Sequence, residues 1–202
     1  MKKAMVSVLF LVVVGCLAYW IFFKAKKEGP KPVSTTVLKH SKVFNASIDA
    51  IVSHYLSMKD AFVEGDTGSV KKQAELFITA INKIDTVEMK KDTVTVYATL
   101  MMSLENLKQN ATSILQQSAI SEMRRDFFSL SSEMYPGFFK LTNYEGKTLY
   151  QQNCPMAFGE NDPASWISDS RKIVNPYLGK NHPEHKSTML HCGELMDSVY
   201  AK

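Results

Sequence analysis

The sequence lacks a strong charge of either sign. Its 202 residues carry 24 Lys and Arg against 20 Asp and Glu, which gives a formal net charge of +4. Much of this excess flanks an N-terminal apolar run, whereas a nucleic-acid-binding domain needs a basic stripe on its folded part. We therefore exclude nucleic acid as a partner. With 45% hydrophobic and 22% charged residues, the chain also does not have the composition of a disordered protein.

Cysteine is scarce, with three residues, whereas methionine is frequent, with eleven. A catalytic constellation is also missing from the helical part of the sequence, where His40 and His54 stand alone and are expected to be surface or packing residues. Cys192 follows His191 directly, but neighbours on a strand point apart, and no orienting acid accompanies them. We predict that the protein is not an enzyme.

Residues 4–23 form an uncharged run that is long enough to cross the roughly 30 Å hydrocarbon core of a bilayer as a helix. We expect an N-terminal transmembrane helix within residues 1–27, because a cleavable signal peptide would have a shorter apolar stretch. The alternative is a lipoprotein signal in which Cys16 becomes lipidated. Both tether the chain to a membrane, but lysines on both sides of the run leave its orientation open.

After a linker at residues 28–41, four segments between residues 42 and 140 carry apolar side chains at helical spacing. Gly65 is expected to stop the first helix, and Asp66 or Thr67 to cap the second. We expect Asp92 to cap the third helix, and Pro136 with Gly137 to kink or end the fourth. Short connections favour an all-α, antiparallel four-helix bundle. Residues 141–202, rich in turn formers, should add an irregular or short-β C-terminal extension.

The C-terminal segment brings together soft potential metal ligands. Cys154 and Met156 would share one side of an extended strand, whereas Met189 and Cys192 would meet only on a turn. Thiols and thioethers select Cu(I) and similar ions, and His191 could supply an imidazole. The segment also contains His182 and His185, which are further candidates.

The same cysteines support a second interpretation. Outside the cytoplasm, Cys154 and Cys192 would most simply form a disulfide, which would stabilise the fold by about 3–4 kcal/mol. Oxidised sulfurs cannot act as thiolate ligands, so the two interpretations exclude each other at any one moment. The residue types alone favour the disulfide.

Four C-terminal runs, CPMA at 154–157, WIS at 166–168, IVNPYLG at 173–179 and MLHCG at 189–193, resemble the signature of the DUF3347 family. YLSMKDAFV at 55–63 and RDFFSLS at 125–131 resemble its helical motifs, so the resemblance spans about residues 44–199. The insertion between Gly179 and Met189 departs from the family pattern. Members of this family, found mainly in Bacteroidetes, are exported domains of uncharacterised function, and some are fused to periplasmic adaptor subunits of copper/silver efflux pumps.

The resemblance implies a periplasmic location and a link to heavy-metal efflux, which moves the balance from the disulfide to the metal. We therefore expect a membrane-anchored accessory domain that binds Cu(I) or Ag(I), held at the inner membrane, or at the outer membrane if Cys16 is lipidated. Its partner would be an efflux adaptor or another metal-handling protein. The expected ligands are the sulfurs and one imidazole of the C-terminal segment: Cys154, Met156, Met189, Cys192 and His191. The alternative is a structural or interaction module closed by a Cys154–Cys192 disulfide.

Overall fold

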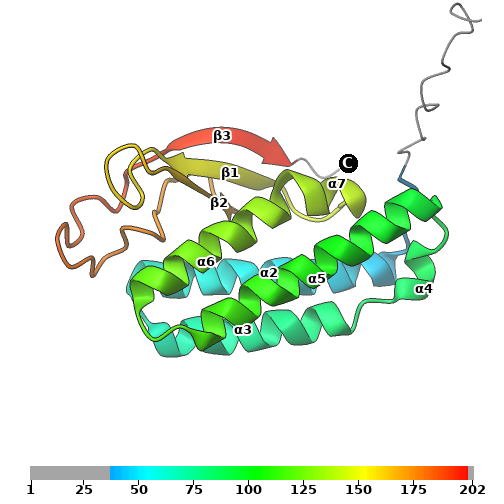
Figure 1. The fold of residues 1–202 in the computed structure, drawn as a ribbon. Helices are drawn as coiled ribbons and strands as arrows, with labels where there is room; N and C mark the ends of the chain where they lie inside the picture. The colour runs from blue at the N-terminus through cyan, green and yellow to red at the C-terminus, as the bar shows by residue number, and fades with distance from the viewer. Residues whose placement is uncertain (1–36, 200–202) are drawn as a thin grey trace, which may run out of the picture. The chain divides into compact units, whose positions relative to one another are not determined.

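The computed structural model describes residues 37–199, which fold into a helical bundle followed by a small β-sheet (Figure 1). The elements, in chain order, are α2 (Lys42–Glu64), α3 (Thr67–Asn82), α4 (Thr86–Met89), α5 (Val94–Gln116), α6 (Ile120–Glu133), a π-helical turn (Met134–Phe138), α7 (Phe139–Leu141), β1 (Leu149–Cys154), β2 (Ala164–Ser168) and β3 (Glu194–Val199). The predicted helical bundle is confirmed, and the C-terminal extension contains a regular sheet.

The start and stop signals of the first two long helices act as the sequence predicts. Gly65 ends α2 with a left-handed φ of 73°, and the side chain of Asp66 caps α3 by accepting a hydrogen bond from the Ser69 amide. The Tyr135–Pro136 peptide bond is cis, and Tyr135 leaves helical geometry just beyond the end of α6, where the sequence places a kink.

The predicted cap of the third helix is wrong. Thr93, not Asp92, caps α5 by accepting a hydrogen bond from the Val96 amide. Asp92 is instead buried, and its carboxylate accepts a hydrogen bond from the Leu38 amide at 2.8 Å. The competing partner is a backbone donor far away in sequence, which residue spacing cannot reveal. The connection before α5 also contains the short helix α4.

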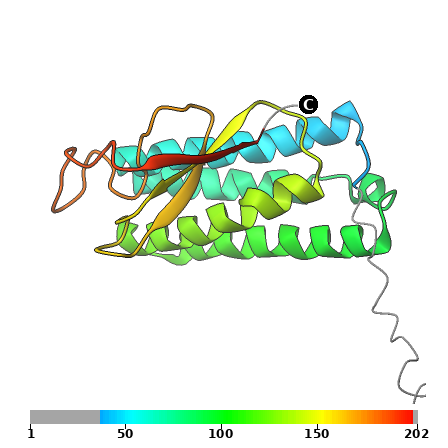
Figure 2. The ribbon, with the colours of Figure 1, turned by 90° about the horizontal axis from the view of Figure 1, so that it is seen from above.

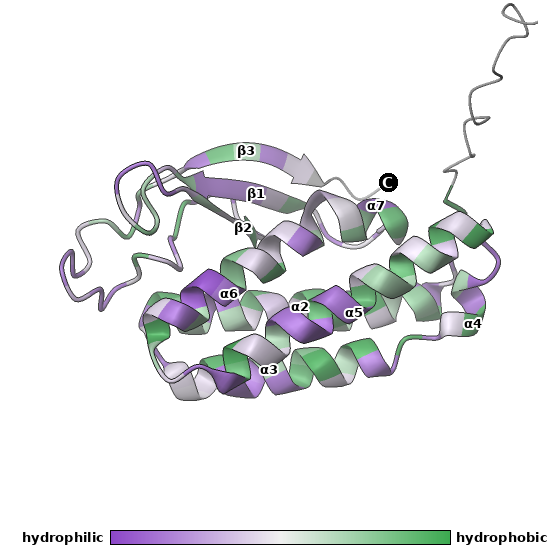
Figure 3. Ribbon diagram, viewed as in Figure 1, coloured by the Kyte–Doolittle hydropathy of each residue, from purple (hydrophilic) through white to green (hydrophobic). Residues whose placement is uncertain are grey.

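Each long helix buries one stripe and exposes the other, as the alternation of green and purple along the ribbons in Figure 3 illustrates. Tyr55 of α2 lies at the centre of the core, where its ring stacks on Phe127 of α6 with 5.1 Å between ring centroids. Its hydroxyl lies 2.6 Å from the Ser131 hydroxyl and accepts a hydrogen bond from the Ile167 amide of β2 at 3.0 Å. One side chain therefore connects two helices with the sheet.

The sheet is antiparallel, with strand order β2-β1-β3. It lies over one face of the bundle, with α6 in contact with β2 (Figures 1 and 2). In the register, Asn153 of β1 is opposite Glu194 of β3, and Cys154 is opposite Ala164 of β2. The end of the central strand thus lies beside both the start of β2 and the start of β3.

The predicted membrane anchor at residues 1–27 lies outside the described residues, as does most of the linker. Between residues 37 and 199, no helix is both long and apolar enough to cross a membrane.

Candidate metal site

The two C-terminal cysteines meet where β1 ends and β3 begins. Cys154 is the last residue of β1 and is buried, whereas Cys192 precedes β3 and is half-buried. Their Sγ atoms are 3.0 Å apart, although 38 positions separate them in the sequence. The antiparallel pairing of Asn153 with Glu194 accounts for this contact, because Cys154 directly follows Asn153 and Cys192 lies two residues before Glu194. The predicted meeting of sulfurs from two distant stretches is confirmed.

Asn175 holds the segment that carries Cys192. Its side-chain amide donates a hydrogen bond to the Cys192 carbonyl at 2.9 Å, and its own backbone amide donates to the Leu190 carbonyl at 2.8 Å. Its side-chain oxygen accepts hydrogen bonds from the amides of Tyr177 and Leu178 at 2.8 and 3.1 Å. Asn175 is fully buried, so its amide group organises both its own loop and the cysteine loop.

Gly193 allows the cysteine loop to approach β1 closely. Its φ is +142°, which favours glycine, and a Cβ atom at this position would lie 2.7 Å from the Asn153 carbonyl oxygen. The glycine after Cys192 therefore has a steric reason: any side chain there would push the loop, and Cys192 with it, away from Cys154.

The two methionines lie near the thiols in different ways. The Cys192 amide donates a hydrogen bond to the Met189 carbonyl at 3.0 Å, so these residues lie on one turn, as the spacing predicts. β1 ends at Cys154, so Met156 lies in the turn beyond the strand instead of on the same strand face. Met156 and Met189 line one pocket of about 490 Å³, together with His182 and His185.

Two histidines of this region, His191 and His182, differ in the ring nitrogen that is available. His191 is exposed, and its Nδ1 lies 2.7 Å from the Ile173 carbonyl, so Nδ1 carries the proton and Nε2 keeps a lone pair. The Nδ1 atom of His182 instead accepts hydrogen bonds from the amides of Glu184 and His185. In the part of the chain that the structure describes, no three or more His, Cys, Asp or Glu side chains gather closely enough to hold a metal ion. His191 is therefore not assembled with both cysteines, and its role as a ligand stays a prediction.

The surroundings of Cys192 keep its sulfur protonated. Burial, followed by the contact with Cys154, raises the pKa of the Cys192 thiol to about 11. A metal ion that binds here must therefore displace a proton. This is the opposite of the lowered pKa that marks a nucleophilic cysteine.

Arg124 is a structural residue of this region that the sequence analysis missed. It is buried on α6 and donates hydrogen bonds to the Pro176 carbonyl at 3.1 Å and to the Phe62 carbonyl at 3.3 Å. Burial lowers the pKa of its guanidinium to about 10, so it remains charged at neutral pH. It joins the end of α2 to the loop that contains Asn175. Its position beside Arg125 in a polar run gave no signal of burial.

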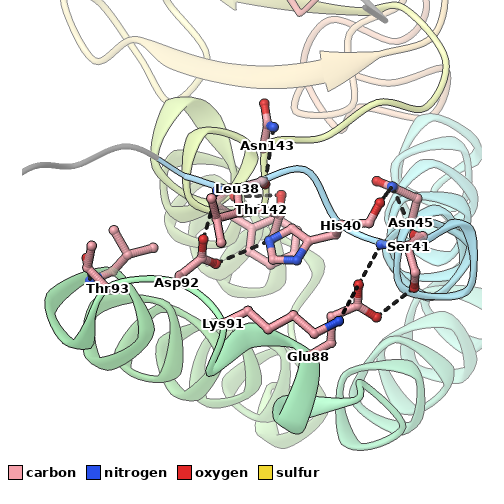
Figure 4. Close-up of polar contacts among 12 residues, drawn as sticks. Leu38, His40, Ser41, Asn45, Glu88, Lys91, Asp92, Thr93, Thr142 and Asn143 are labelled. Carbon is pink, nitrogen blue, oxygen red and sulfur yellow. Dashed lines mark hydrogen bonds and ion pairs between the residues drawn. The ribbon is translucent and has the colours of Figure 1, made fainter.

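His40 is the second residue that sequence reasoning placed incompletely. It is buried, as a packing residue would be, but its Nε2 lies 3.3 Å from the Asp92 carboxylate (Figure 4). Beside this pair, the amide and hydroxyl of Ser41 donate hydrogen bonds to Glu88 of α4 at 2.5 and 2.6 Å. These contacts fix the first described residues to the end of the bundle where α4 lies.

Fold and site together define a helical bundle with a small capping sheet that positions two thiols, one buried and one half-buried. Residues 51–145 match the model of a family described as "Protein of unknown function (DUF3347)". This part of the chain is therefore similar to the DUF3347 family. The matched range covers the helices from within α2 to just beyond α7, and ends before the sheet and its cysteines. No curated protein and no solved structure matches the chain.

Proposed function

We propose that the reduced protein binds one soft monovalent ion, Cu(I) or Ag(I), between Cys154 and Cys192, as a membrane-tethered accessory domain of metal handling. The observation that carries this proposal is the convergence of the two Sγ atoms to 3.0 Å. Thiolates are soft ligands that select such ions over calcium or magnesium. Met156 and Met189 are the proposed thioether ligands, because each lies within three residues of one of the cysteines in the sequence. Both line one pocket, although neither cysteine does.

The two sulfurs must move apart to hold an ion. Two thiolates at roughly 2.3 Å from one ion, the bond length known for zinc, lie about 3.8 Å apart in a tetrahedral site and about 4.6 Å apart in the linear arrangement of two-coordinate Cu(I) or Ag(I). The present separation is 3.0 Å, so the sulfurs must move apart by about 0.8–1.6 Å. Cys192 lies on a turn before β3 and is half-buried, and Asn175 holds only its backbone carbonyl. Its sulfur is therefore the one that moves. Cys154, at the end of the central strand, stays in place.

The cellular part of the proposal derives from the family. The relation of some family members to efflux adaptors supports a periplasmic domain that buffers a metal ion or delivers it to a pump. The uncharged run at residues 4–23 supports attachment to the membrane. In this role the bundle is a rigid support, and no bond is made or broken except those to the metal.

The test is a competitive Cu(I) titration of the reduced, full-length protein in detergent, with Cys16→Ser as the background so that two thiols remain. We expect about one Cu(I) per chain, and loss of this binding in the additional Cys192→Ser variant. Met156→Leu with Met189→Leu should weaken it, whereas Met102→Leu, an exposed methionine on α5, is the matched control. Unchanged binding in the Cys192→Ser variant, with the fold verified by circular dichroism, would refute the proposal.

The second candidate function is an interaction module closed by a Cys154–Cys192 disulfide. The specific observation in its favour is again the 3.0 Å separation, because the two sulfurs need to approach by only about 1 Å to reach the roughly 2.05 Å of a disulfide bond. Such a bridge closes a loop of 38 residues, and in the chain-entropy model it stabilises the fold by about 4 kcal/mol. Blocked thiols in protein isolated without reductant, together with no Cu(I) uptake after reduction, would favour this function.

A further inference from the structure

The end of the bundle where the described chain begins carries an unusual set of exposed aliphatic side chains. Val94, Val43 and Val87 are 85%, 78% and 69% exposed, the highest values among the large exposed hydrophobic residues of the described chain. They come from the first residue of α5, the first turn of α2 and from α4. Leu38, 45% exposed, adds a fourth. Single exposed valines are ordinary, but a group at one end of a molecule indicates a contact surface.

The hydrogen bonds of this end show that the segments carrying these residues lie beside one another. Ser41 of the segment before α2 binds Glu88 of α4, and the Leu38 amide binds Asp92 just before α5. Each exposed valine lies within two residues of one of these contacts. Figure 4 shows the segments that contain Ser41, Glu88 and Asp92 converging there.

Most carboxylates at this end are drawn inward, whereas its lysines are exposed. Glu88 accepts hydrogen bonds from Ser41, Asp92 is buried and the side chain of Glu145 is 17% exposed; Asp85, the cap of α4, is an exposed carboxylate. The lysines point outward: Lys42 and Lys90 are exposed, and the side chains of Lys39 and Lys91 are 76% and 67% exposed. Aliphatic side chains surrounded by outward lysines match an anionic lipid surface, where the valines enter the interface and the lysines meet the headgroups.

We propose that this end, defined by Leu38, Val43, Val87 and Val94 with Lys42, Lys90 and Lys91, rests on an anionic lipid bilayer. The described chain begins here, at residue 37, and the uncharged run at residues 4–23 precedes it in the sequence. The inference therefore extends the membrane attachment of the proposed function by naming the face that meets the lipid. Figures 1 and 2 place the loops around residues 155–163 and 169–193 at the opposite end. The sulfur site then faces away from the bilayer, where a second protein can reach it.

The experiment is lysine footprinting of the full-length protein in vesicles. The chain is reconstituted into vesicles of phosphatidylcholine with phosphatidylglycerol, and into detergent as the reference, and reacted with an amine-acetylating reagent. Mass spectrometry then gives the rate at each lysine. We expect Lys42, Lys90 and Lys91 to react about threefold or more slowly in the vesicles. Lys172 and Lys186, exposed in the distant loops, are the internal controls and should keep their rates.

A variant separates contact from simple proximity. Val43→Gln with Val87→Gln and Val94→Gln changes only exposed side chains, so it should fold normally and yet lose the protection of the three lysines. A chain that fails to float with the vesicles would contradict the membrane attachment itself. A chain that floats, but whose three lysines react as fast as in detergent, would overturn this inference alone. Equal protection in the variant would also overturn it, because the apolar contact would then play no part.

Discussion

Replacement of Asn175 by alanine should separate the support of the thiol pair from the stability of the bundle. The change removes three side-chain hydrogen bonds at a fully buried position: one to the Cys192 carbonyl, and two from the amides of Tyr177 and Leu178. At about 1 kcal/mol each, with further cost for the partners left unsatisfied, the free energy of unfolding should fall by roughly 3–4 kcal/mol. Because the Cys192 loop loses its anchor, the thiol should also become more accessible.

The matched control is Asn181→Ala in the same loop region. Asn181 is exposed and its side chain makes one hydrogen bond, to the Glu64 carbonyl at 2.8 Å, so its loss should cost under about 1 kcal/mol.

The assay has two parts. Urea unfolding followed by circular dichroism gives the loss of stability, and reaction with a chromogenic disulfide reagent gives the accessibility of Cys192 in the Cys16→Ser background. A third variant, Asn175→Asp, keeps the oxygen that accepts from Tyr177 and Leu178 but cannot donate to Cys192. Asn175→Asp should therefore react faster than the unsubstituted protein at Cys192, but lose less free energy of unfolding than Asn175→Ala. If Asn175→Ala costs no more than Asn181→Ala, or leaves the thiol reaction unchanged, the assigned role of Asn175 is wrong.

Three further predictions follow from the same geometry. Gly193→Ala should lower the free energy of unfolding by about 2 kcal/mol more than Gly159→Ala does. Both glycines have φ near +140°, but only at Gly193 would the new Cβ lie 2.7 Å from a carbonyl oxygen. Equal losses in urea unfolding would contradict this. Tyr55→Phe should cost roughly 1–2 kcal/mol through loss of the Ser131 and Ile167 contacts, with Tyr97→Phe on the partly exposed side of α5 near neutral. Cu(I) affinity should rise at least about tenfold per pH unit between pH 6 and 8, because the Cys192 thiol, whose pKa is raised to about 11, is protonated throughout and must release its proton; a flat titration would exclude its thiolate as a ligand.

The helices were predictable because their evidence is local. The apolar stripe from Phe44 to Phe62 faces the core, and the stop at Gly65 and the cap at Asp66 each depend on residues within one turn. Asp92 failed for the opposite reason. Its sequence position suited a helix cap, but its carboxylate binds a backbone amide 54 residues away, and Thr93 took the capping position. The predicted position of the helix cap was therefore wrong by only one residue, but the carboxylate of Asp92 has a different role from the predicted one.

The candidate site could be predicted in part. The turn that joins Met189 to Cys192 follows from spacing, and the meeting of two cysteines follows from their scarcity and their motifs. The residues that create the geometry give no such signal. Asn175 acts through a long-range contact to the Cys192 carbonyl, and Arg124 acts through carbonyls of α2 and the 176 loop. An asparagine before a proline and an arginine in a polar helix resemble ordinary surface residues in any local pattern.

The length of α2 connects the two proposals. With 23 residues at 1.5 Å each, α2 spans about 34 Å, from the end with the lysines to the end where Lys180 donates a backbone hydrogen bond to the Val63 carbonyl. If attachment to the bilayer were the only requirement, the sulfur ligands could lie at any distance from the membrane surface. Here the sulfur loops are held at the far end by contacts to the last turn of α2, through Arg124 and Lys180. If both proposals hold, an ion bound there lies beyond the headgroup region, where a second protein can reach it. The two tests can therefore fail separately. Lysine protection without Cu(I) binding would indicate a lipid-bound spacer domain. Cu(I) binding without lysine protection would indicate a metal-binding domain that is tethered by its linker alone.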